Sequence, residues 1–315
     1  MSIDAMVEGR CAEGTPPTPE LPPRDPAGHK GTFGTVVIVG GSMQLPRVML
    51  GGAVIAARAA LRSGVGKVQL AVPEPLALAA LAALESATAQ ALPVDARGDL
   101  DPAGCAAAID DALDGAHALA IGPALGAGHA VEQVVARTIA HARVPLIVDA
   151  DALNALARTP QFDREFESAR AILTPHPGEY ARLAAALHLS PASADDDPSR
   201  EAAAMALAQR VGCVAVVKGA RTAVSDGVHT WSARAGTPAL GTGGSGDALA
   251  GIAASFAAQF HRPGIDLSLF DCARLAVVVH GLAARRWSSA RGDAGLLASE
   301  LCELLPETLG SLRAA

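Results

Sequence analysis

The residues with the clearest potential for chemistry lie in a glycine-rich stretch, 241–251, with the sequence GTGGSGDALAG. Four of its first six residues are glycines, and after Asp247 the apolar spacing becomes helical, at Leu249, Ile252 and Phe256. A glycine-rich turn that opens a helix allows a close backbone approach, and its unpaired N–H groups favour an anion such as phosphate. Asp247 is expected at or next to the N-cap of this helix. Its carboxylate therefore either caps the helix or acts as a base beside a bound phosphate.

This stretch alone does not identify a ligand, because an ordinary capped loop has a similar composition. It matches neither the P-loop pattern G-x-x-x-x-G-K-[ST] nor a G-x-G-x-x-G that follows the first strand. Neither of those phosphate-binding mechanisms therefore transfers directly. The functional interpretation depends on what the rest of the chain places beside this loop.

Alternating strand and helix patterns predict a mostly parallel sheet with helices on both faces, in a single α/β domain. The expected parallel strands are β-branched or otherwise apolar runs: 35–39, 67–72, 118–121, 146–148, 171–173 and 214–217. Residues 222–225 and 228–231 are expected to form a hairpin, because Asp226-Gly227 suits a type I′ turn. Helices are predicted at 51–61, 248–260, 267–287 and 295–305.

Polar or glycine-rich residues follow four of the predicted strands. These junctions are Gly122–Gly126, Asp149–Asn154, Thr174–Glu179 and Lys218–Thr222. In an open parallel sheet, ligands bind outside the carboxyl ends of the strands. We therefore expect the four junctions to converge on one cleft.

The overall composition limits the classes of protein to be considered. Half of the 315 residues are apolar and 18% are charged, which predicts a globular fold. The abundance of alanine and the low aromatic content of 3% predict helices packed closely through small side chains. A net charge of −7 without a basic cluster argues against a general nucleic-acid-binding surface. Five cysteines without a C-x-x-C pair fit reduced thiols in a cytoplasmic protein better than disulfides or a zinc site.

The first 28 residues are expected to differ in structure from the rest of the chain. Residues 1–28 are rich in proline and poor in large apolar residues, which predicts a disordered arm, and residues 29–315 form the domain. The sequence shows no signal peptide, and its longest apolar run is too short to span a bilayer. A cytoplasmic, membrane-free location is the expectation.

From residue 29 onward, blocks of sequence resemble a known family in the family's order. They are HKGTFG, VVIVGGS, GAVIAARAALRSGVGKV, AIGPALG, VDADALN, LTPHPGEYARL, VVKGART and GTPALGTGGSGDALAGI. The chain resembles the ADP/ATP-dependent NAD(P)H-hydrate dehydratases, a ribokinase-like family whose members are often fused to an epimerase. The resemblance implies a ribokinase-like fold and a hydro-lyase of metabolite repair. Arm 1–28 is too short for an epimerase domain, so a functional link to a separate epimerase is expected.

The resemblance also implies a reaction. In this family a hydrated nicotinamide ring, as in NADHX or NADPHX, is phosphorylated on its hydroxyl by ADP or ATP. Phosphate then leaves more easily than hydroxide, and NADH or NADPH is restored. Mg²⁺ and an adenine nucleotide are the implied cofactor and co-substrate. A homotetramer or another homo-oligomer is the implied assembly.

Individual roles follow from the matching blocks, each with a structural alternative. Asp247 is implied as the catalytic base and a substrate contact, with helix capping as the alternative. The other substrate contacts are implied at Ala56, Gly122, Gly126 and His176. Gly122 alternatively ends a strand, and His176 alternatively makes a structural hydrogen bond.

The nucleotide is implied to bind two segments of the chain. They comprise Lys218, Gly219, Ala220, Arg221 and Thr222, and then Gly243, Gly244, Ser245 and Gly246. Lys218 supplies a point charge to phosphate, or is alternatively a solvated residue at a strand end. Asp149 and Asp151 are candidates for Mg²⁺ binding through water, although Asp151 alternatively caps the next helix.

Further residues carry less definite expectations. Glu179 is either a site carboxylate or a first-turn helix residue, and Lys30 with 31–34 is a candidate to contribute to the cleft, with no assigned role. The family usually has glycine at the position of Ala124 and Asn-Pro-Gly-Met at 237–240, where this chain has Thr-Pro-Ala-Leu. Two other functions stay open. One is a ribokinase-like kinase of a vitamin precursor, and the other is a catalytically silent nucleotide-binding sensor.

Overall fold

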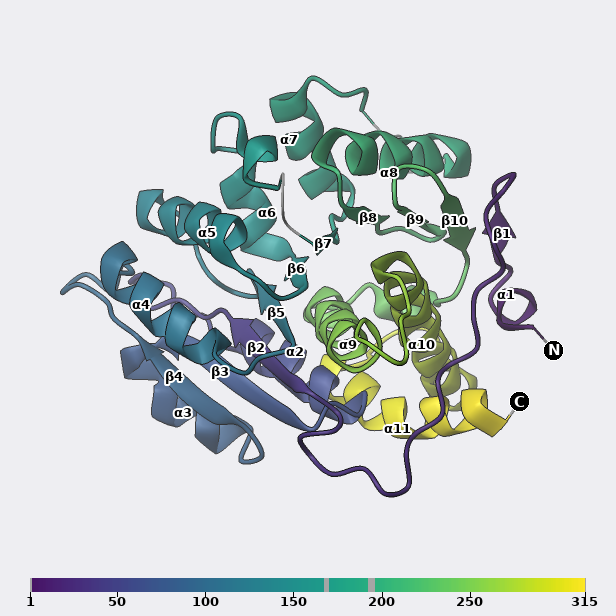
Figure 1. Ribbon diagram of the computed structural model, residues 1–315, viewed down its shortest axis with the longest axis horizontal. Helices are drawn as coiled ribbons and strands as arrows, with labels where there is room; N and C mark the ends of the chain where they lie inside the picture. The colour runs from purple at the N-terminus through teal and green to yellow at the C-terminus, as the bar shows by residue number, and fades with distance from the viewer. Residues whose placement is uncertain (1, 167–169, 192–195, 315) are drawn as a thin grey trace.

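The computed structural model describes residues 2–166, 170–191 and 196–314. Their strands form one sheet in the order β1-β10-β9-β8-β7-β6-β5-β2-β3-β4 (Figure 1). The strands are β1 (Arg10–Cys11), β2 (Thr35–Val39), β3 (Lys67–Pro73), β4 (Thr88–Leu92), β5 (Ala118–Ile121), β6 (Leu146–Val148), β7 (Ala171–Leu173), β8 (Val214–Val217), β9 (Thr222–Ser225) and β10 (Thr230–Ala233). Strands β2 to β8 pair in parallel, whereas β9, β10 and β1 extend the sheet in antiparallel pairs. The predicted mostly parallel sheet is confirmed.

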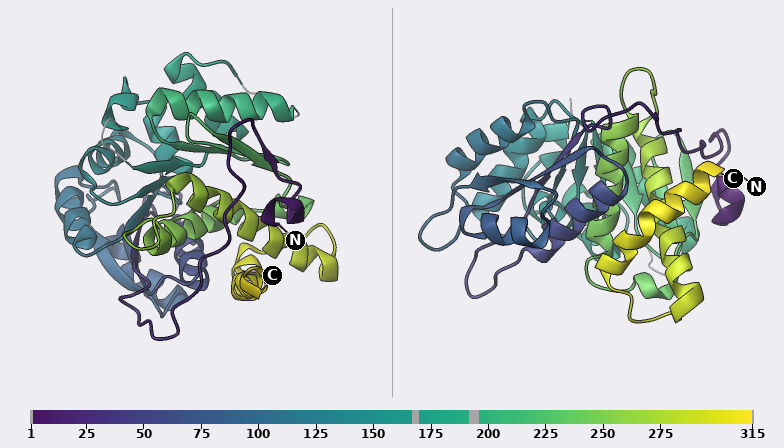
Figure 2. Two further views of the ribbon diagram at one scale, coloured as in Figure 1. Left: turned by 45° about the vertical axis from the view of Figure 1, so that its right-hand side comes forward. Right: turned by 90° about the horizontal axis from the view of Figure 1, so that it is seen from below.

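Helices cover both faces of the sheet (Figures 1 and 2). One apolar core holds side chains of α2 (Gly51–Arg62), α3 (Ala77–Ala83), α9 (Ser245–Phe260), α10 (Leu269–Arg291) and α11 (Ala298–Ala314). A second core, on the other face, holds side chains of α4 (Pro102–Leu113), α5 (His129–His141), α6 (Ala150–Leu156), α7 (Pro177–Leu187) and α8 (Asp197–Val211). This is the layered α/β architecture that the alternating pattern predicts.

The small residues of α2 and α9 explain how tightly the first helical layer packs. A Cβ atom at Gly251 of α9 would lie 2.0 Å from the carbonyl oxygen of Ala56 on α2. Only glycine permits that approach, and Ala56 itself is fully buried. The expectation of closely packed, alanine-rich helices is therefore confirmed.

Most predicted strands have the expected bounds, but the hairpin differs from its prediction. Ser225 pairs with Thr230, so four residues form the loop and β10 begins two residues later than expected. Of the Asp-Gly pair, Gly227 has a positive φ and Asp226 does not. The Asp226 carboxylate instead accepts hydrogen bonds from the backbone N–H groups of Val228 (2.9 Å) and His229 (2.6 Å). This side-chain turn replaces the expected type I′ turn.

The N-terminal arm is ordered in the structure, which contradicts the prediction of disorder. It contains α1 (Ile3–Met6) and β1, and β1 extends the sheet beside β10. Val7 is fully buried, and the carboxylate of Asp4 accepts a hydrogen bond from Nε1 of Trp231 at 2.7 Å. The purple trace in Figures 1 and 2 shows the arm running along the outside of the molecule. Proline content alone was a poor guide here, because a few buried anchors hold the segment.

The segment 30–34 also lies away from its expected position. It leads into the first residue of β2, and the carbonyl of Lys30 lies against Gly66, just before β3 begins. It therefore lies at the amino ends of these strands, opposite to the edge where the cleft was predicted. Across the described ranges, no helix is long and apolar enough to cross a lipid bilayer.

Candidate active site

Five neighbouring strands end at one edge of the sheet, and their following residues form the floor of the site. Strands β8, β7, β6, β5 and β2 are adjacent and parallel. The residues that directly follow them are Lys218, Thr174, Asp149, Gly122 and Gly40. The predicted convergence of the four junctions is thus confirmed.

The first turn of α9 approaches this floor from the other side. Its N-cap is Gly244, which has φ +89°, and Ser245, Gly246 and Asp247 form the first turn. A Cβ atom at Gly246 would lie 3.3 Å from the Nζ atom of Lys218, so this ammonium group lies against the helix terminus. Unpaired N–H groups and a lysine together make an electropositive point suited to phosphate.

A cavity of about 680 Å³ opens beside the start of α9. Much of its wall is apolar, formed by Ala220, Ala235, Pro238, Leu240, Leu249 and Val277. Lys218, Ser245 and Gly246 lie at its polar part. An apolar wall with a few placed polar groups is the usual form of a small-molecule site, and this volume suits a nucleotide.

Most of the residues predicted to bind the nucleotide line this cavity. Lys218, Gly219, Ala220 and Thr222 line it, together with Ser245 and Gly246. Gly243 and Gly244 are not among its lining residues. The Ser245 hydroxyl donates a hydrogen bond to the carbonyl of Leu240 at 2.7 Å. Ser245 would therefore contact a ligand through its backbone.

Arg221 does not take part in the cavity, which corrects the prediction for this residue. Its side chain is 3% exposed and points to the opposite side of the wall. There its guanidinium donates to the carboxylate of Asp197 (Nε–Oδ2, 3.2 Å) and to the carbonyl of Glu8 (Nη1–O, 2.7 Å). Successive side chains of an extended segment alternate in direction, which explains why its neighbours Ala220 and Thr222 face the cavity.

Asp247, the predicted base, lies in the first turn of α9 and has a shifted pKa. Burial raises the pKa of its carboxyl to about 6, and the negative charge of Asp149 adds to the rise, while Lys218 opposes it. Gly244 is the N-cap of α9, and no described side chain makes a capping hydrogen bond there. Helix capping by Asp247 is therefore excluded in this structure.

Gly52 of α2 faces Asp247 and was not among the predicted site residues. A Cβ atom at Gly52 would lie 3.0 Å from both carboxylate oxygens of Asp247. Glycine at this position therefore keeps the carboxylate approachable from the side of α2. The sequence signal was weak, since Gly52 follows another glycine at the start of an ordinary helix.

Lys218 is the centre of a buried charge cluster. Its Nζ lies 2.8 Å from Oδ1 of Asp149 and 3.9 Å from Oε2 of Glu179. The Thr174 hydroxyl donates to the same Asp149 oxygen at 2.8 Å. Burial would lower the pKa of Lys218, but Asp149 and Glu179 overcome it and the net shift is upward. Lys218 is thus a fixed cation rather than a solvated strand-end residue.

Glu179 and His176 extend this cluster at the start of α7. His176 is the N-cap: its Nδ1 accepts a hydrogen bond from the N–H of Gly178 at 3.0 Å, while its Nε2 lies 3.2 Å from Oε1 of Glu179. The Glu179 carboxylate accepts a hydrogen bond from the N–H of His176 at 2.8 Å, which completes a capping box. Burial raises the pKa of Glu179 to about 7. The structural alternative is thus observed for both residues, since His176 caps α7 and Glu179 lies in its first turn, and His176 also lines the cavity.

The two predicted metal-binding aspartates lie close together but are already engaged. Asp149 is the N-cap residue of α6 and forms the ion pair with Lys218. Asp151 does not cap α6; its Oδ2 accepts a hydrogen bond from the N–H of Gly126 at 2.9 Å. Within the part of the chain that the structure describes, no group of three or more His, Cys, Asp or Glu side chains could hold a metal.

The predicted substrate glycines are required by packing within the protein. A Cβ atom at Gly122 would lie 1.8 Å from the carbonyl of Asp149, and one at Gly126 would lie 2.6 Å from the Ser42 hydroxyl. Ala56 is buried between α2 and α9, so its side chain does not face an open site. Close approach of the chain to itself therefore accounts for both glycines, and Gly122 directly follows β5, as its alternative role at a strand end predicts.

Ala124 adopts a left-handed backbone conformation, with φ +56°. A side chain in this region costs about 1–2 kcal/mol relative to glycine, which gives a physical reason for the family's glycine at this position. We predict that Ala124→Gly raises the free energy of unfolding by roughly 1 kcal/mol, after the entropic cost of glycine is subtracted. Denaturant unfolding measures this change. Ala103→Gly, within α4, is the control and is expected to lower stability.

His280 of α10 is a second residue that sequence analysis missed. It lines the cavity, and its Nε2 lies 2.9 Å from the carbonyl oxygen of Ser245. Burial lowers its pKa to about 4, so the ring is neutral and Nε2–H donates to that carbonyl. It supports the first turn of α9 from a helix 35 residues away in sequence. No local sequence pattern indicates that His280 and Ser245 are in contact.

Comparison with known proteins agrees with this geometry. Residues 36–307 match the family model described as NAD(P)H-hydrate dehydratase. The ADP-dependent (S)-NAD(P)H-hydrate dehydratase of Xanthomonas campestris is 36% identical over 293 residues, covering 91% of this chain and 92% of that protein. The bifunctional NAD(P)H-hydrate repair enzyme Nnr of Moorella thermoacetica is 36% identical over 301 residues. That match covers 93% of this chain but 52% of the relative, so the chain spans about half of the bifunctional protein.

A solved structure gives the same result for the fold. The ADP/ATP-dependent NAD(P)H-hydrate dehydratase of Bacillus subtilis, co-crystallised with ATP/Mg²⁺, aligns with a TM-score of 0.72 at 29% identity. The alignment covers 96% of this chain and all of that one. The ribokinase-like fold that the resemblance implied is confirmed. This chain belongs to the NAD(P)H-hydrate dehydratase family.

Proposed function

We propose that this protein restores NADH and NADPH from their hydrates, in a dehydration driven by ADP. The observation that carries the proposal is the position of Asp247. It is a half-buried carboxylate with a raised pKa, in the first turn of a glycine-opened helix and beside a nucleotide-sized cavity that Lys218 borders. The relative from Xanthomonas that is similar over nearly its whole length is named as ADP-dependent, which supports ADP as the donor.

The nucleotide is proposed to lie with its base and sugar against the apolar wall and its phosphates towards Lys218 and the N-terminus of α9. The cluster holds Lys218 charged and in place, because Asp149 binds it at 2.8 Å. The N–H groups of the first turn of α9 then stabilise charge on the transferring phosphoryl group. The neutral His280 fixes the carbonyl of Ser245 and so maintains the shape of this turn.

Asp247 is proposed to accept the proton of the ring hydroxyl. As that O–H bond breaks, the oxygen bonds to the terminal phosphorus and the bond from phosphorus to the bridging oxygen breaks, releasing AMP when ADP is the donor. The ring C–O bond then breaks with loss of phosphate, assisted by the ring nitrogen, and the adjacent carbon loses a proton. A ring double bond forms. The hydrate thus loses the elements of water without hydroxide as the leaving group.

Mg²⁺ is proposed to enter with the nucleotide rather than to occupy a protein cage. The described side chains provide no group of three metal ligands, yet Asp149 and Asp151 both add negative charge at Asp247. Two carboxylates without a full cage fit the usual Mg²⁺ site, in which phosphate oxygens and water complete the coordination. Bound Mg²⁺ would neutralise phosphate charge. Co-crystallisation of the Bacillus dehydratase with ATP/Mg²⁺ supports this role.

The direct test is recovery of the near-ultraviolet absorbance of NADH from a preparation of its hydrate, with the purified protein, Mg²⁺ and either ADP or ATP. Nucleotide-dependent recovery, with faster turnover of ADP, is expected. A stable phosphorylated product without recovery would instead support a small-molecule kinase. Nucleotide binding with no reaction on the hydrate or on vitamin precursors would support a silent sensor.

The pH dependence of this reaction reports on the proposed base. Because the pKa of Asp247 lies at about 6, above its usual 3.8, the carboxyl is protonated and inactive as a base below that value. We predict that kcat/KM for the hydrate rises as pH increases to about 6 and then levels off. Glu179 also titrates in this range, at about 7. Glu179→Gln should therefore leave the lower inflection in place, and its disappearance in that variant would contradict the assignment.

Three further properties follow from the family as proposals. An NAD(P)HX epimerase is proposed as the functional partner, because the similar Moorella enzyme is named as a bifunctional repair enzyme. We propose that the protein acts in the cytoplasm. Its assembly is proposed to be a homo-oligomer, which light scattering of the purified protein would test.

A further inference from the structure

The nucleotide cavity has two walls that are tied to the N-terminal arm from behind. The first wall is the segment 218–222. Arg221 anchors it, and among the described residues of this segment only the Arg221 side chain faces away from the cavity. Nη1 of Arg221 donates to the carbonyl of Glu8 in the arm at 2.7 Å. This contact joins the arm to a wall residue whose two neighbours, Ala220 and Thr222, line the cavity.

The second wall is the segment 235–238, and Arg285 of α10 anchors it. One nitrogen of this guanidinium donates to the carbonyl of Arg234, directly before the wall. The other donates to the carbonyl of Met6 in the arm at 2.9 Å. A single side chain therefore joins the arm to the second wall.

Asp197 connects the two walls behind the cavity. Its carboxylate binds Arg200 at 2.8 Å, Arg221 at 3.2 Å and Arg234 at 3.1 Å. Arg200 also donates to the carbonyl of Arg221 at 3.0 Å. The two walls thus share one carboxylate, and each has its own bond to the arm.

The arm itself is held firmly enough to act as a support. β1 pairs with β10, and the Asp4 carboxylate accepts bonds from the N–H and hydroxyl of Thr18 and from Trp231. Ile3 and Val7 are buried, and Arg274 donates to the carbonyl of Pro16 at 2.8 Å. Figure 1 shows β1 of the arm beside β10, at the outer edge of the sheet.

We propose that the N-terminal arm sets the spacing of the two walls of the nucleotide cavity, with Arg221 and Arg285 as positioning residues. The inference rests on the proposed function, because it takes the cavity to be the nucleotide site. When the arm is detached, Arg221 and Arg285 each lose a partner and the walls gain freedom that nucleotide binding must then remove. Detachment therefore weakens nucleotide affinity, whereas the chemistry at Asp247 is unchanged once the nucleotide is bound.

The test compares two neighbouring arginines of α10. Arg285→Ala removes the bonds to Met6 and Arg234, whereas Arg286→Ala removes contacts with Ser311 and Glu307 on α11. Both side chains are half-buried, so the loss of packing is similar. Calorimetric titration with ADP should show about fivefold to 30-fold weaker binding for Arg285→Ala. Arg286→Ala should bind ADP like the wild type, and kcat at saturating ADP should be similar in all three proteins.

A second variant releases the arm without altering α10. Asp4→Ala removes the bonds to Thr18 and Trp231, and limited proteolysis of the folded protein should then cut the arm more rapidly. Weaker ADP binding in Asp4→Ala, restored in part by a peptide of residues 2–21 added in trans, is the expected result. Unchanged ADP affinity in a variant whose arm is cut rapidly would overturn the inference. If the wild type itself failed to bind ADP, the proposed function would fail instead.

Discussion

Replacing Asp247 with asparagine is expected to lower kcat for dehydration of the hydrate by about 10²–10⁴-fold. The amide keeps the size of the side chain but cannot accept the hydroxyl proton as a base. Nothing in the fold depends on the carboxylate, because it neither caps α9 nor forms an ion pair within hydrogen-bonding distance among the described residues. ADP affinity should change little or increase slightly, since a negative charge next to the phosphates is removed.

The effect should appear in single-turnover measurements of NADH recovery with ADP and Mg²⁺ at saturation. Asp111→Asn, which changes an exposed carboxylate on α4, is the control and should react like the wild type. If Asp247→Asn retained most of the wild-type rate, another group would have to act as the base. The thermal stability of the variant should equal or exceed that of the wild type, because burial disfavours the charged form of Asp247.

The contrast between Lys218 and Arg221 shows what the sequence could predict about the site. The strand pattern placed Lys218 at the end of a buried strand, and parallel pairing then brought it beside Asp149. A run of five residues that resembles a family motif does not say which side chains face the ligand. Arg221 faces the arm because side chains alternate in an extended segment and because Asp197, from α8, provides its charge partner.

The same limit applies to the residues that were missed. Gly52 and His280 come from helices whose packing against α9 brings them to the site. Their helices were predicted, but the face that meets Asp247 or Ser245 is set by tertiary packing. The prediction that the arm is disordered was wrong for a related reason. Asp4 accepts a hydrogen bond from Trp231, 227 residues away in sequence, and composition does not indicate such a contact.

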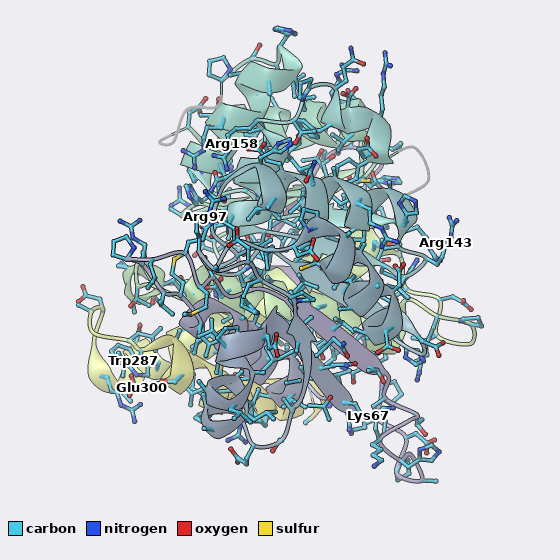
Figure 3. All side chains as sticks on the ribbon, turned by 90° about the vertical axis from the view of Figure 1, so that its left-hand side faces the viewer. Lys67, Arg97, Arg143, Arg158, Trp287 and Glu300 are labelled. Atoms are coloured by element: carbon cyan, nitrogen blue, oxygen red, sulfur yellow. The ribbon has the colours of Figure 1, made fainter. Side chains whose placement is uncertain are left out.

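The second large effect is expected for Lys218→Met, which keeps the apolar stem and removes the charge. Loss of one charge-assisted contact to the phosphates should weaken ADP binding by about 10- to 100-fold. The buried carboxylate of Asp149 also loses its ion pair, and the free energy of unfolding should fall by about 3 kcal/mol. Lys67→Met is the control, because Lys67 is exposed at the start of β3. In Figure 3, Lys67 lies on the side of the molecule opposite Trp287 and Glu300.

A double variant separates the two roles of Lys218. In Lys218→Met with Asp149→Asn, the carboxylate closest to the missing ammonium group is neutralised as well, so much of the lost stability should return. Nucleotide affinity should not return, because the cation that faces the first turn of α9 is still absent. Denaturant unfolding and ADP titration measure the two quantities independently. With ADP titrated in the absence of Mg²⁺, recovery of both in the double variant would show that Lys218 acts on the nucleotide only by neutralising Asp149, whereas recovery of stability alone is the result expected for a direct phosphate contact.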